Sequence, residues 1–158
     1  MEEMKELTIR YAAVSDYNEV EAIMKQVHQL HVGWRPDIYK DADPVLPQSI
    51  FTHMVDEKSI LLAEINGTVV ALLSFEIRHV QSDKQVARDI LFIDDLAVKE
   101  EYRGNGIGSE LLQIIKEKVI REHLDGLELQ VNARNNRAKL MYEKNGFSAK
   151  SINMELLL

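Results

Sequence analysis

The chain has 158 residues, close to the usual size of one domain, and 46% of them are hydrophobic, which suffices for a buried core. We therefore expect a single domain over residues 1–158. The net charge of -7 argues against nucleic acid as a partner, because phosphate binding requires clustered Lys and Arg. The absence of cysteine excludes disulfides, thiolate catalysis and thiolate metal sites.

Membrane and metal partners are not expected either. No apolar run approaches the ~20 residues that a membrane span needs, and the acidic start Met1–Glu6 lacks the apolar segment of a signal peptide. The five histidines lack the spacing of a zinc or di-iron helix. We expect a cytosolic protein without a metal.

The first half of the chain predicts a strand and two helices. Apolar and polar residues alternate over 7–11, which indicates a strand. Asp16 and Glu19 have the spacing of a capping box that opens a helix to about His31. Pro47 suits the first turn of a second, shorter helix.

A β-hairpin is expected next. Asn66-Gly67 is a strong hairpin signal, because both positions require positive φ, and it joins the apolar segments 59–65 and 68–79. A polar loop over 80–85 then leads to residues 89–98, whose Ile, Leu and Val content predicts a central strand.

The second half predicts alternating helices and strands. An amphipathic helix extends to about His123, and residues 127–131 form a strand. Asn135 caps a further helix that Asn145-Gly146 ends, and residues 147–157 form a last strand or strand pair. The fold class is thus mixed α/β (α+β), with one mixed, mostly antiparallel sheet of six to seven strands and about four helices on both faces.

The most informative segment is the turn from Arg103 to Gly108, which carries three glycines at alternate positions between a strand and a helix. Exposed N–H groups backed by a helix dipole form an anion site suited to a diphosphate. Arg103 adds a fixed positive charge. The glycines match neither the Walker nor the dinucleotide-binding pattern. The plainer alternative is a flexible turn that only caps the helix.

Two motifs carry a family resemblance. The segment Arg103 to Gly108 matches the signature R-x-x-G-x-G/A of the GNAT superfamily of N-acetyltransferases, and the segment Asn135 to Phe147 resembles its N-x-x-A-x-x-x-Y-x-x-x-G-F block. The resemblance implies a GNAT-like fold. In that fold the fourth and fifth strands, here 89–98 and 127–131, splay apart around acetyl-coenzyme A.

The resemblance also implies which residues contact this cosubstrate. Strand backbone would pair with the pantetheine arm, and amides of the glycine turn would hold the pyrophosphate. A helix cap is the alternative role of Asn135. The implied contact residues are Leu96, Ala97, Val98, Arg103, Gly104, Asn105, Gly106, Ile107, Gly108, Asn135 and Tyr142.

The implied reaction is direct attack of a primary amine on the thioester in a ternary complex, which requires a general base and a general acid. Tyr142 occupies the position that many family members use for the acid, and a packed aromatic residue is the alternative. An activity-free acyl-coenzyme-A-binding regulatory module is the alternative function, and a nucleotide-binding protein is a third.

Asp94 and Asp95 are the candidate bases, because a carboxylate in an apolar strand is costly unless it is paired or functional. Strand alternation predicts that they face opposite sides of the sheet, with Asp94 on the face of Phe92 and Leu96. Some relatives carry a glutamate as the base where this chain has Phe92.

The acceptor side of the site is less defined. In the superfamily the first two helices and their loop shape this side, and here His28, His31, Trp34 and Tyr39 would form an aromatic, partly polar wall. Glu76 is a further candidate both for binding the acceptor and for the general base, and His79 is a further candidate for the base. The acceptor can be a small-molecule amine or a protein or peptide amine. The sequence leaves open whether the protein forms a homodimer.

Overall fold

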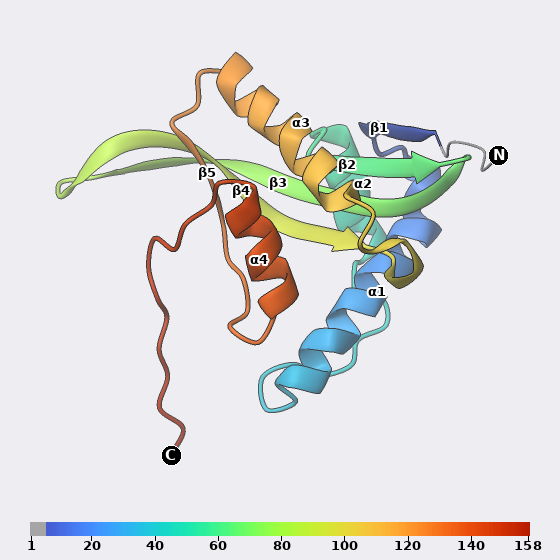
Figure 1. Cartoon of the computed structure of the whole chain (residues 1–158), viewed down its shortest axis with the longest axis horizontal. Helices are drawn as coiled ribbons and strands as arrows, with labels where there is room; N and C mark the ends of the chain where they lie inside the picture. Colours follow the sequence, from blue (N-terminus) through green and yellow to red (C-terminus); the bar gives the residue numbers. More distant parts are fainter. Residues whose placement is uncertain (1–5) are drawn as a thin grey trace.

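The computed structural model describes residues 6–158, which form a mixed sheet flanked by helices (Figure 1). The strands are β1 (Leu7–Tyr11), β2 (Ile60–Ile65), β3 (Thr68–Ser82), β4 (Gln85–Val98) and β5 (Gly126–Leu129). The helices are α1 (Tyr17–Trp34), α2 (Gln48–Asp56), α3 (Ile107–Arg121) and α4 (Asn136–Lys144). The strand order is β1-β2-β3-β4-β5, and every pair is antiparallel except the parallel pair of β4 and β5.

The predicted mixed, mostly antiparallel sheet is confirmed, but its strand count is five rather than six to seven. Residues 147–157 form no strand within the described structure, although their sequence predicts one. This segment instead leaves α4 as an extended arm whose end lies away from the sheet (Figure 1). Apolar and polar residues alternate in this segment as they do in a strand, but no strand among residues 6–158 lies beside it to form backbone hydrogen bonds.

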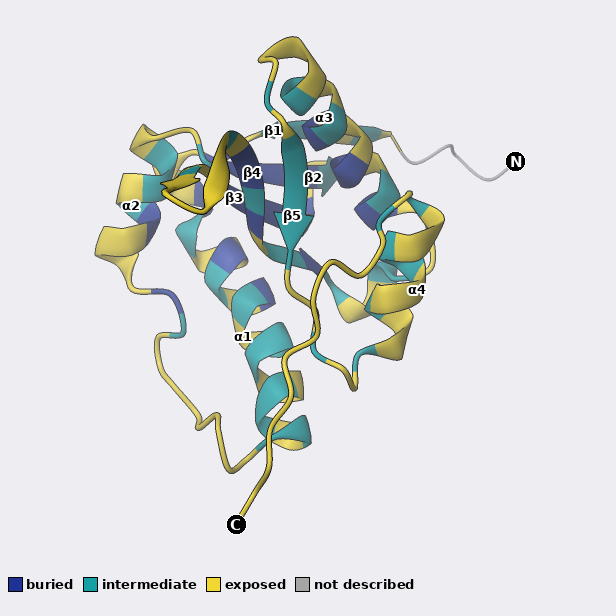
Figure 2. Ribbon diagram, turned by 90° about the vertical axis from the view of Figure 1, so that its left-hand side faces the viewer, coloured by how far each residue is buried: buried dark blue, intermediate teal, exposed yellow. Residues whose placement is uncertain are grey.

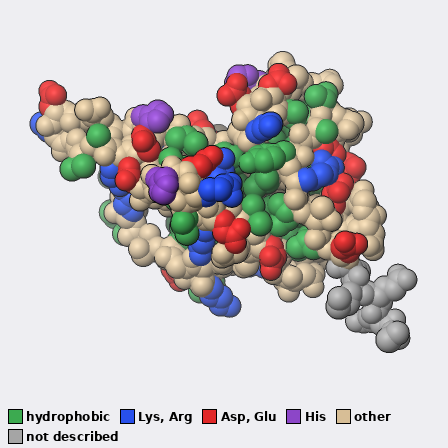
Figure 3. Space-filling view, turned by 90° about the horizontal axis from the view of Figure 1, so that it is seen from above, with side chains coloured by type: hydrophobic (Ala, Val, Ile, Leu, Met, Phe, Trp, Pro, Cys, Tyr) green, Lys and Arg blue, Asp and Glu red, His purple; other side chains and the backbone are tan. Residues whose placement is uncertain are grey.

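The β-hairpin of β3 and β4 is longer than the sequence predicts. Residues 80–85 were expected to form a loop, yet pairing continues through Val80 with Arg88 and Ser82 with Gln85. Polar side chains permit this extension, because backbone hydrogen bonds alone can continue a two-stranded ribbon into solvent. The tip projects from the body at the left of Figures 1 and 3.

Helices cover both faces of the sheet, as predicted, and each face has its own apolar cluster (Figure 2). Leu73 and Leu91 pack with Leu111 of α3 on one face. Leu72 packs with Ile23 of α1 on the other. Neighbouring residues of β3 therefore supply opposite clusters, as strand alternation requires. Within residues 6–158, no helix has the length and apolarity needed to cross a membrane.

The start of α1 differs from the predicted capping box. The Asp16 carboxylate does not cap α1; it accepts two hydrogen bonds from Arg10, at 2.8 and 2.9 Å, because a buried carboxylate needs a compensating cation. Glu19 instead accepts a hydrogen bond from the Val69 amide of β3 at 3.0 Å. Both carboxylates thus attach the helix start to the sheet.

Two isoleucines of α3 provide a test of this packing. Ile115 is fully buried and Ile120 is 73% exposed. We expect Ile115→Ala to lower the free energy of unfolding by about 2–5 kcal/mol, because it leaves a cavity in the core. The matched change Ile120→Ala is expected to shift it by roughly 0.5 kcal/mol or less. Chemical denaturation measures both, and equal losses in the two variants would contradict the placement of α3.

Candidate functional site

The sheet opens where β4 and β5 part. β5 pairs only with Ile90–Ile93, whereas β4 continues to Val98. Within residues 6–158, the edge of β4 that faces β5 therefore has no strand partner over residues 94–98, and its backbone groups on that side are available to a ligand. The predicted splay of these two strands is confirmed.

A β-bulge lies at this opening. In the ladder between β3 and β4, Ser74 pairs with Asp95 and Phe75 pairs with Ile93, so Asp94 is an extra residue on β4. A bulge interrupts the strict alternation of side chains between the two faces of a sheet.

The bulge overturns one prediction about the carboxylates. Leu96 packs in the cluster beneath α3, and Ala97 packs in the cluster beneath α1. Phe92, opposite Glu76, lies on the face of Ala97 rather than that of Leu96. The expectation that Asp94 shares a face with both Phe92 and Leu96 is therefore wrong, because the register changes at Asp94 itself.

Asp95 is partly buried and hydrogen-bonded. The Ser74 hydroxyl donates to its carboxylate at 2.8 Å. Burial raises the pKa of Asp95, while the Ser74 hydrogen bond and the nearby His31 oppose that rise. Ser74 was missed in the sequence, because only the register of β3 against β4 places it opposite Asp95.

Asp94 lies among other charges and remains accessible to solvent. Partial burial, followed by the negative charges of Glu76 and Asp95, raises the pKa of Asp94 to about 6. Arg78 opposes this rise, and its guanidinium also lies 3.6 Å from the centre of the Phe92 ring. The result is a carboxylate that titrates near neutral pH, which is the range useful for proton transfer.

Tyr142 lies on α4, with its ring 5.6 Å from that of Phe147. Burial, and then the charge of Asp95, raise the pKa of Tyr142 to about 12. Its phenol therefore stays protonated at neutral pH and can act only as a proton donor there. The charge of Asp95 on β4 therefore acts on the phenol of Tyr142 on α4.

The glycine turn forms the N-terminus of α3. Gly104 and Gly106 have backbone φ angles of 79° and 77°, which residues other than glycine rarely adopt. Within the described residues, no atom outside Gly106 and its two chain neighbours lies within 4 Å of its Cβ position. No side chain in the described part of the chain caps α3, so its first N–H groups are left for another acceptor. The turn therefore has the geometry of an anion site.

Two arginines lie at this turn. The Arg103 Nε donates to the Val98 carbonyl at 3.0 Å, which fixes the side chain against the end of β4. Arg137 of α4 reaches the turn as well, with Nη2 3.5 Å from the Cβ position of Gly104. Sequence reasoning missed Arg137, because it belongs to the other motif and meets the turn only in the folded chain.

Gly108 has a different role from the other two glycines. A Cβ at this buried position would lie 2.8 Å from the Met141 sulfur of α4. The absence of a side chain at Gly108 therefore leaves room for the Met141 side chain of α4 rather than for a ligand. Asn135 has its structural role too, because its side chain accepts the Ala138 amide at 3.1 Å and caps α4.

The four predicted acceptor-side residues do come together. The His31 ring centre lies 5.4 Å from those of both Trp34 and Tyr39, and His28 lies 6.3 Å from Tyr39. The Nδ1 of His31 is buried without a hydrogen-bond partner in the described structure. Burial lowers the pKa of His31, as does His28, whereas Asp95 opposes them. His31 thus connects this aromatic wall to the carboxylates of β4.

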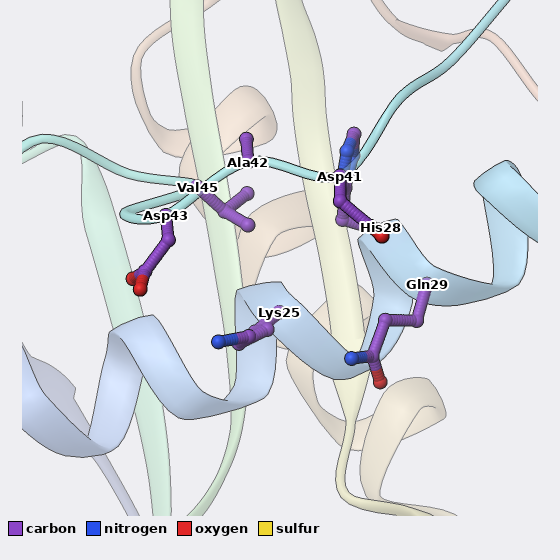
Figure 4. Close-up of a pocket in the computed structure, with 7 residues that line it drawn as sticks. All are labelled: Lys25, His28, Gln29, Asp41, Ala42, Asp43 and Val45. Carbon is purple, nitrogen blue, oxygen red and sulfur yellow. The ribbon is translucent and has the colours of Figure 1, made fainter.

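A separate hollow of about 330 Å³ lies between α1 and the following loop (Figure 4). It is lined by Lys25, His28, Gln29, Asp41, Ala42, Asp43 and Val45. Among the predicted site residues only His28 reaches it, and its Nε2 is 2.6 Å from the Lys40 carbonyl. None of the lining residues belongs to β4, α3 or α4, so this hollow is distinct from the opening in the sheet.

His79, considered above as a base, lies outside this arrangement. It pairs with Asp89 on the exposed part of the β3–β4 hairpin, where its side chain is 79% exposed. Within residues 6–158, no three His, Cys, Asp or Glu side chains are placed to hold a metal ion together.

The motifs, the parted strands and the uncapped helix agree with one family. The family model described as "Acetyltransferase (GNAT) family" matches residues 24–147. The chain belongs to the GNAT acetyltransferase family.

Individual relatives agree with this assignment. The chain is 26% identical to the S-alkylcysteine N-acetyltransferase of Bacillus subtilis over 151 residues, which cover 91% of this chain and 80% of that enzyme. It is 41% identical over 56 residues to N-alpha-acetyltransferase 30 of Saccharomyces cerevisiae. The latter match covers 35% of this chain and 32% of the yeast protein.

Solved structures share the fold over nearly the whole chain. A point mutant of the BH1408 protein from Bacillus halodurans is 32% identical, with a TM-score of 0.92, over 96% of this chain and 99% of that one. Aminoglycoside N-acetyltransferase AAC(6')-Iy, solved in complex with coenzyme A, has a TM-score of 0.73 at 13% identity. That comparison covers 100% of this chain and 98% of the other.

The charge cluster at the bulge can be tested by titration. Glu76→Gln removes a negative charge beside Asp94, so we expect the pKa of Asp94 to fall from about 6 toward the ordinary value of about 3.9. Carboxyl-carbon NMR across pH 3–8 measures this shift. The control Glu117→Gln on α3 is expected to leave it unchanged. A wild-type Asp94 that already titrates near 3.9 would contradict the described environment.

Proposed function

We propose that the protein transfers an acetyl group from acetyl-coenzyme A to a primary amine by direct attack in a ternary complex. The observation that carries this proposal is the open edge of β4, which leads from two carboxylates into the glycine turn of α3. Membership in the GNAT family supports it. The chain would act as one acetyltransferase domain.

The residues at the opening fit coenzyme A. Backbone groups of Leu96 and Val98 would pair with the pantetheine arm along the edge that β5 leaves open. Amides from Arg103 to Gly108 would hold the pyrophosphate at the start of α3. Within residues 6–158 no carboxylate forms an ion pair with Arg103 or Arg137, so both guanidinium groups are available to phosphate oxygens. Asn135 would lie beside the arm while it caps α4.

Asp94 is the better of the two candidate bases. A pKa of about 6 leaves it ionised at neutral pH and still basic enough to accept a proton from a bound ammonium group, directly or through water. Asp95 is committed to its hydrogen bond with Ser74. We assign to Asp95 the supporting role of placing negative charge where the ammonium group enters.

Tyr142 is the proposed acid. Acetyl-coenzyme A supplies an activated acetyl group and a thiol leaving group. As the amine nitrogen bonds to the acetyl carbon and the carbon–sulfur bond breaks, the Tyr142 hydroxyl would donate its proton to the sulfur, and the second proton that the nitrogen loses would restore the phenol. The raised pKa of Tyr142 keeps its phenol protonated at neutral pH, so a proton is present when the sulfur leaves.

The aromatic wall of His28, His31, Trp34 and Tyr39 would contact the acceptor, with Glu76 beside Asp94 as a further anionic group. The relative aligned over most of this chain is named for S-alkylcysteine, an amino-acid derivative. The yeast relative is named for N-alpha acetylation. We therefore propose an α-amino group of an amino acid or peptide as the first acceptor to examine.

Coenzyme A release tests the reaction and the role of Tyr142 together. Purified protein, acetyl-coenzyme A and a panel of amino acids, peptides and polyamines are expected to yield free thiol that depends on the amine. Tyr142→Phe is expected to lower kcat by roughly 10²-fold with little change in coenzyme A affinity, since only proton donation is lost. Tyr11→Phe, on the far edge strand β1, serves as the control.

The same measurements separate the alternatives. Tight coenzyme A binding without turnover on any amine, and without an effect of Tyr142→Phe, would indicate an acyl-coenzyme-A-binding module. Calorimetry that shows ATP binding more tightly than coenzyme A would indicate a nucleotide-binding protein instead.

The glycine turn has a matched internal control. Gly106 and Gly67 have nearly equal φ, 77° and 78°, and open surroundings, but Gly67 lies in the β2–β3 turn. Valine at either position is expected to strain the backbone by about 1–2 kcal/mol. Only Gly106→Val is expected to raise the coenzyme A dissociation constant, by tenfold or more, because its side chain blocks approach to the amides. Calorimetry on both variants checks this, and equal affinities would remove the turn from the binding site.

A further inference from the structure

Arg78 of β3 is a cation placed beside the carboxylates of the candidate site. Its Nε donates to the Glu76 carboxylate, and its guanidinium carbon lies 3.6 Å from the centre of the Phe92 ring. Its positive charge also acts on Asp94. A guanidinium that is both stacked and hydrogen-bonded has lost much of its freedom, so it is held in place before any ligand arrives.

Strand alternation places Arg78 on the acceptor side of the sheet. Ser74, Glu76 and Arg78 occupy alternate positions of β3 and so share one face, because the extra residue of the bulge belongs to β4. On that face the Ser74 hydroxyl donates to Asp95 at 2.8 Å, and the charge of Asp95 acts on His31 of the aromatic wall. Arg78 therefore lies on the side of the sheet where the acceptor is expected to bind.

The ion pair with Glu76 uses only part of the Arg78 guanidinium. Within residues 6–158, its Nη1 and Nη2 make no hydrogen bond. Together these two nitrogens form the planar fork that binds a carboxylate through two parallel hydrogen bonds. The side chains of Arg78 and Glu76 are 46% and 49% exposed, and an ion pair this exposed contributes little to folding stability. The fork is thus open to a ligand, and its removal is not expected to unfold the protein.

We propose that the acceptor is a free α-amino acid, with its ammonium group at Asp94 and Glu76 and its carboxylate on the Nη1–Nη2 fork of Arg78. The two charged groups of an α-amino acid are attached to the same carbon, so its binding site needs an anion beside a cation. Asp94 and Arg78 supply that pair, whereas a polyamine or a peptide N-terminus would leave the Arg78 charge without a partner. The aromatic wall then remains for the amino-acid side chain. This inference deepens the proposed acetyl transfer and rests on it.

Matched acceptors test the carboxylate site. Methionine and phenylalanine are assayed by coenzyme A release against their carboxamides, which keep the side chain and the α-amine but lose the negative charge. We expect the wild-type protein to favour each free acid in kcat/KM by about 10- to 100-fold, the range for one charge-assisted contact. At about pH 8 Asp94 is ionised, so its titration does not enter the comparison.

The variant Arg78→Gln removes the fork and keeps a polar side chain. For the free acids, kcat/KM is expected to fall by about 10- to 100-fold, mainly through KM, while carboxamide turnover stays within about twofold of wild type and shows that the variant is folded. Arg88→Gln is the matched control, because Arg88 lies on the same hairpin and pairs with a carboxylate, that of Glu128 on β5. It is expected to leave the turnover of acids and carboxamides unchanged.

The outcomes distinguish this inference from the proposed function. Equal use of acids and carboxamides by the wild-type protein, or an acid preference that survives Arg78→Gln, would overturn the carboxylate site and leave acetyl transfer standing. Equal losses for both acceptors in Arg78→Gln would do the same, because Arg78 would then only offset the charge at Asp94. Turnover confined to polyamines or peptides would also overturn the carboxylate site. Coenzyme A binding without turnover of any amine would instead remove the proposed function itself.

Discussion

One extra residue in β4 determines how the candidate site is built. Pairing between β4 and β5 ends at Ile93, and the bulge follows at Asp94. Beyond it, Leu96 faces the cluster beneath α3, while Asp95 faces Ser74 and the helix α1. A regular ladder would have exchanged these faces and placed the Asp95 carboxylate in the apolar cluster with α3. The bulge thereby allows carboxylates to occupy an otherwise apolar central strand.

The electrostatics of the site follow from that placement. Two adjacent carboxylates and Glu76 share a small, partly desolvated region, so their charges oppose one another and the pKa of Asp94 is raised. The charge of Asp95 acts in the same direction on the Tyr142 phenol. Burial, reinforced by these negative charges, therefore produces both a carboxylate that accepts protons near neutrality and a phenol that stays protonated there. Arg78 limits the cost of gathering these charges without neutralising Asp94.

The sequence predicted local features well and relationships between strands poorly. The helices, the hairpin turn and the glycine turn depend on residues close together in the chain, and each was found in its expected place. The bulge at Asp94, the contact of Ser74 with Asp95 and the position of Arg137 depend on register and packing between distant segments. No periodicity within one strand reveals an extra residue relative to its neighbour. For the same reason, the alternating pattern of residues 147–157 indicates a strand but does not say which strand lies beside it.

The two family motifs are separated in sequence but form one structural unit. Gly108 gives Met141 room, Asn145 donates to the Ser109 hydroxyl at 3.1 Å, and Arg137 reaches Gly104. Side chains of Arg137, Met141 and Asn145 thus reach the start of α3 from the α4 motif. The missing side chain at Gly108 therefore leaves room for the Met141 side chain, which precedes Tyr142 on α4. A glycine that seemed to serve a ligand therefore serves the contact between the two motifs, next to the residue proposed as the acid.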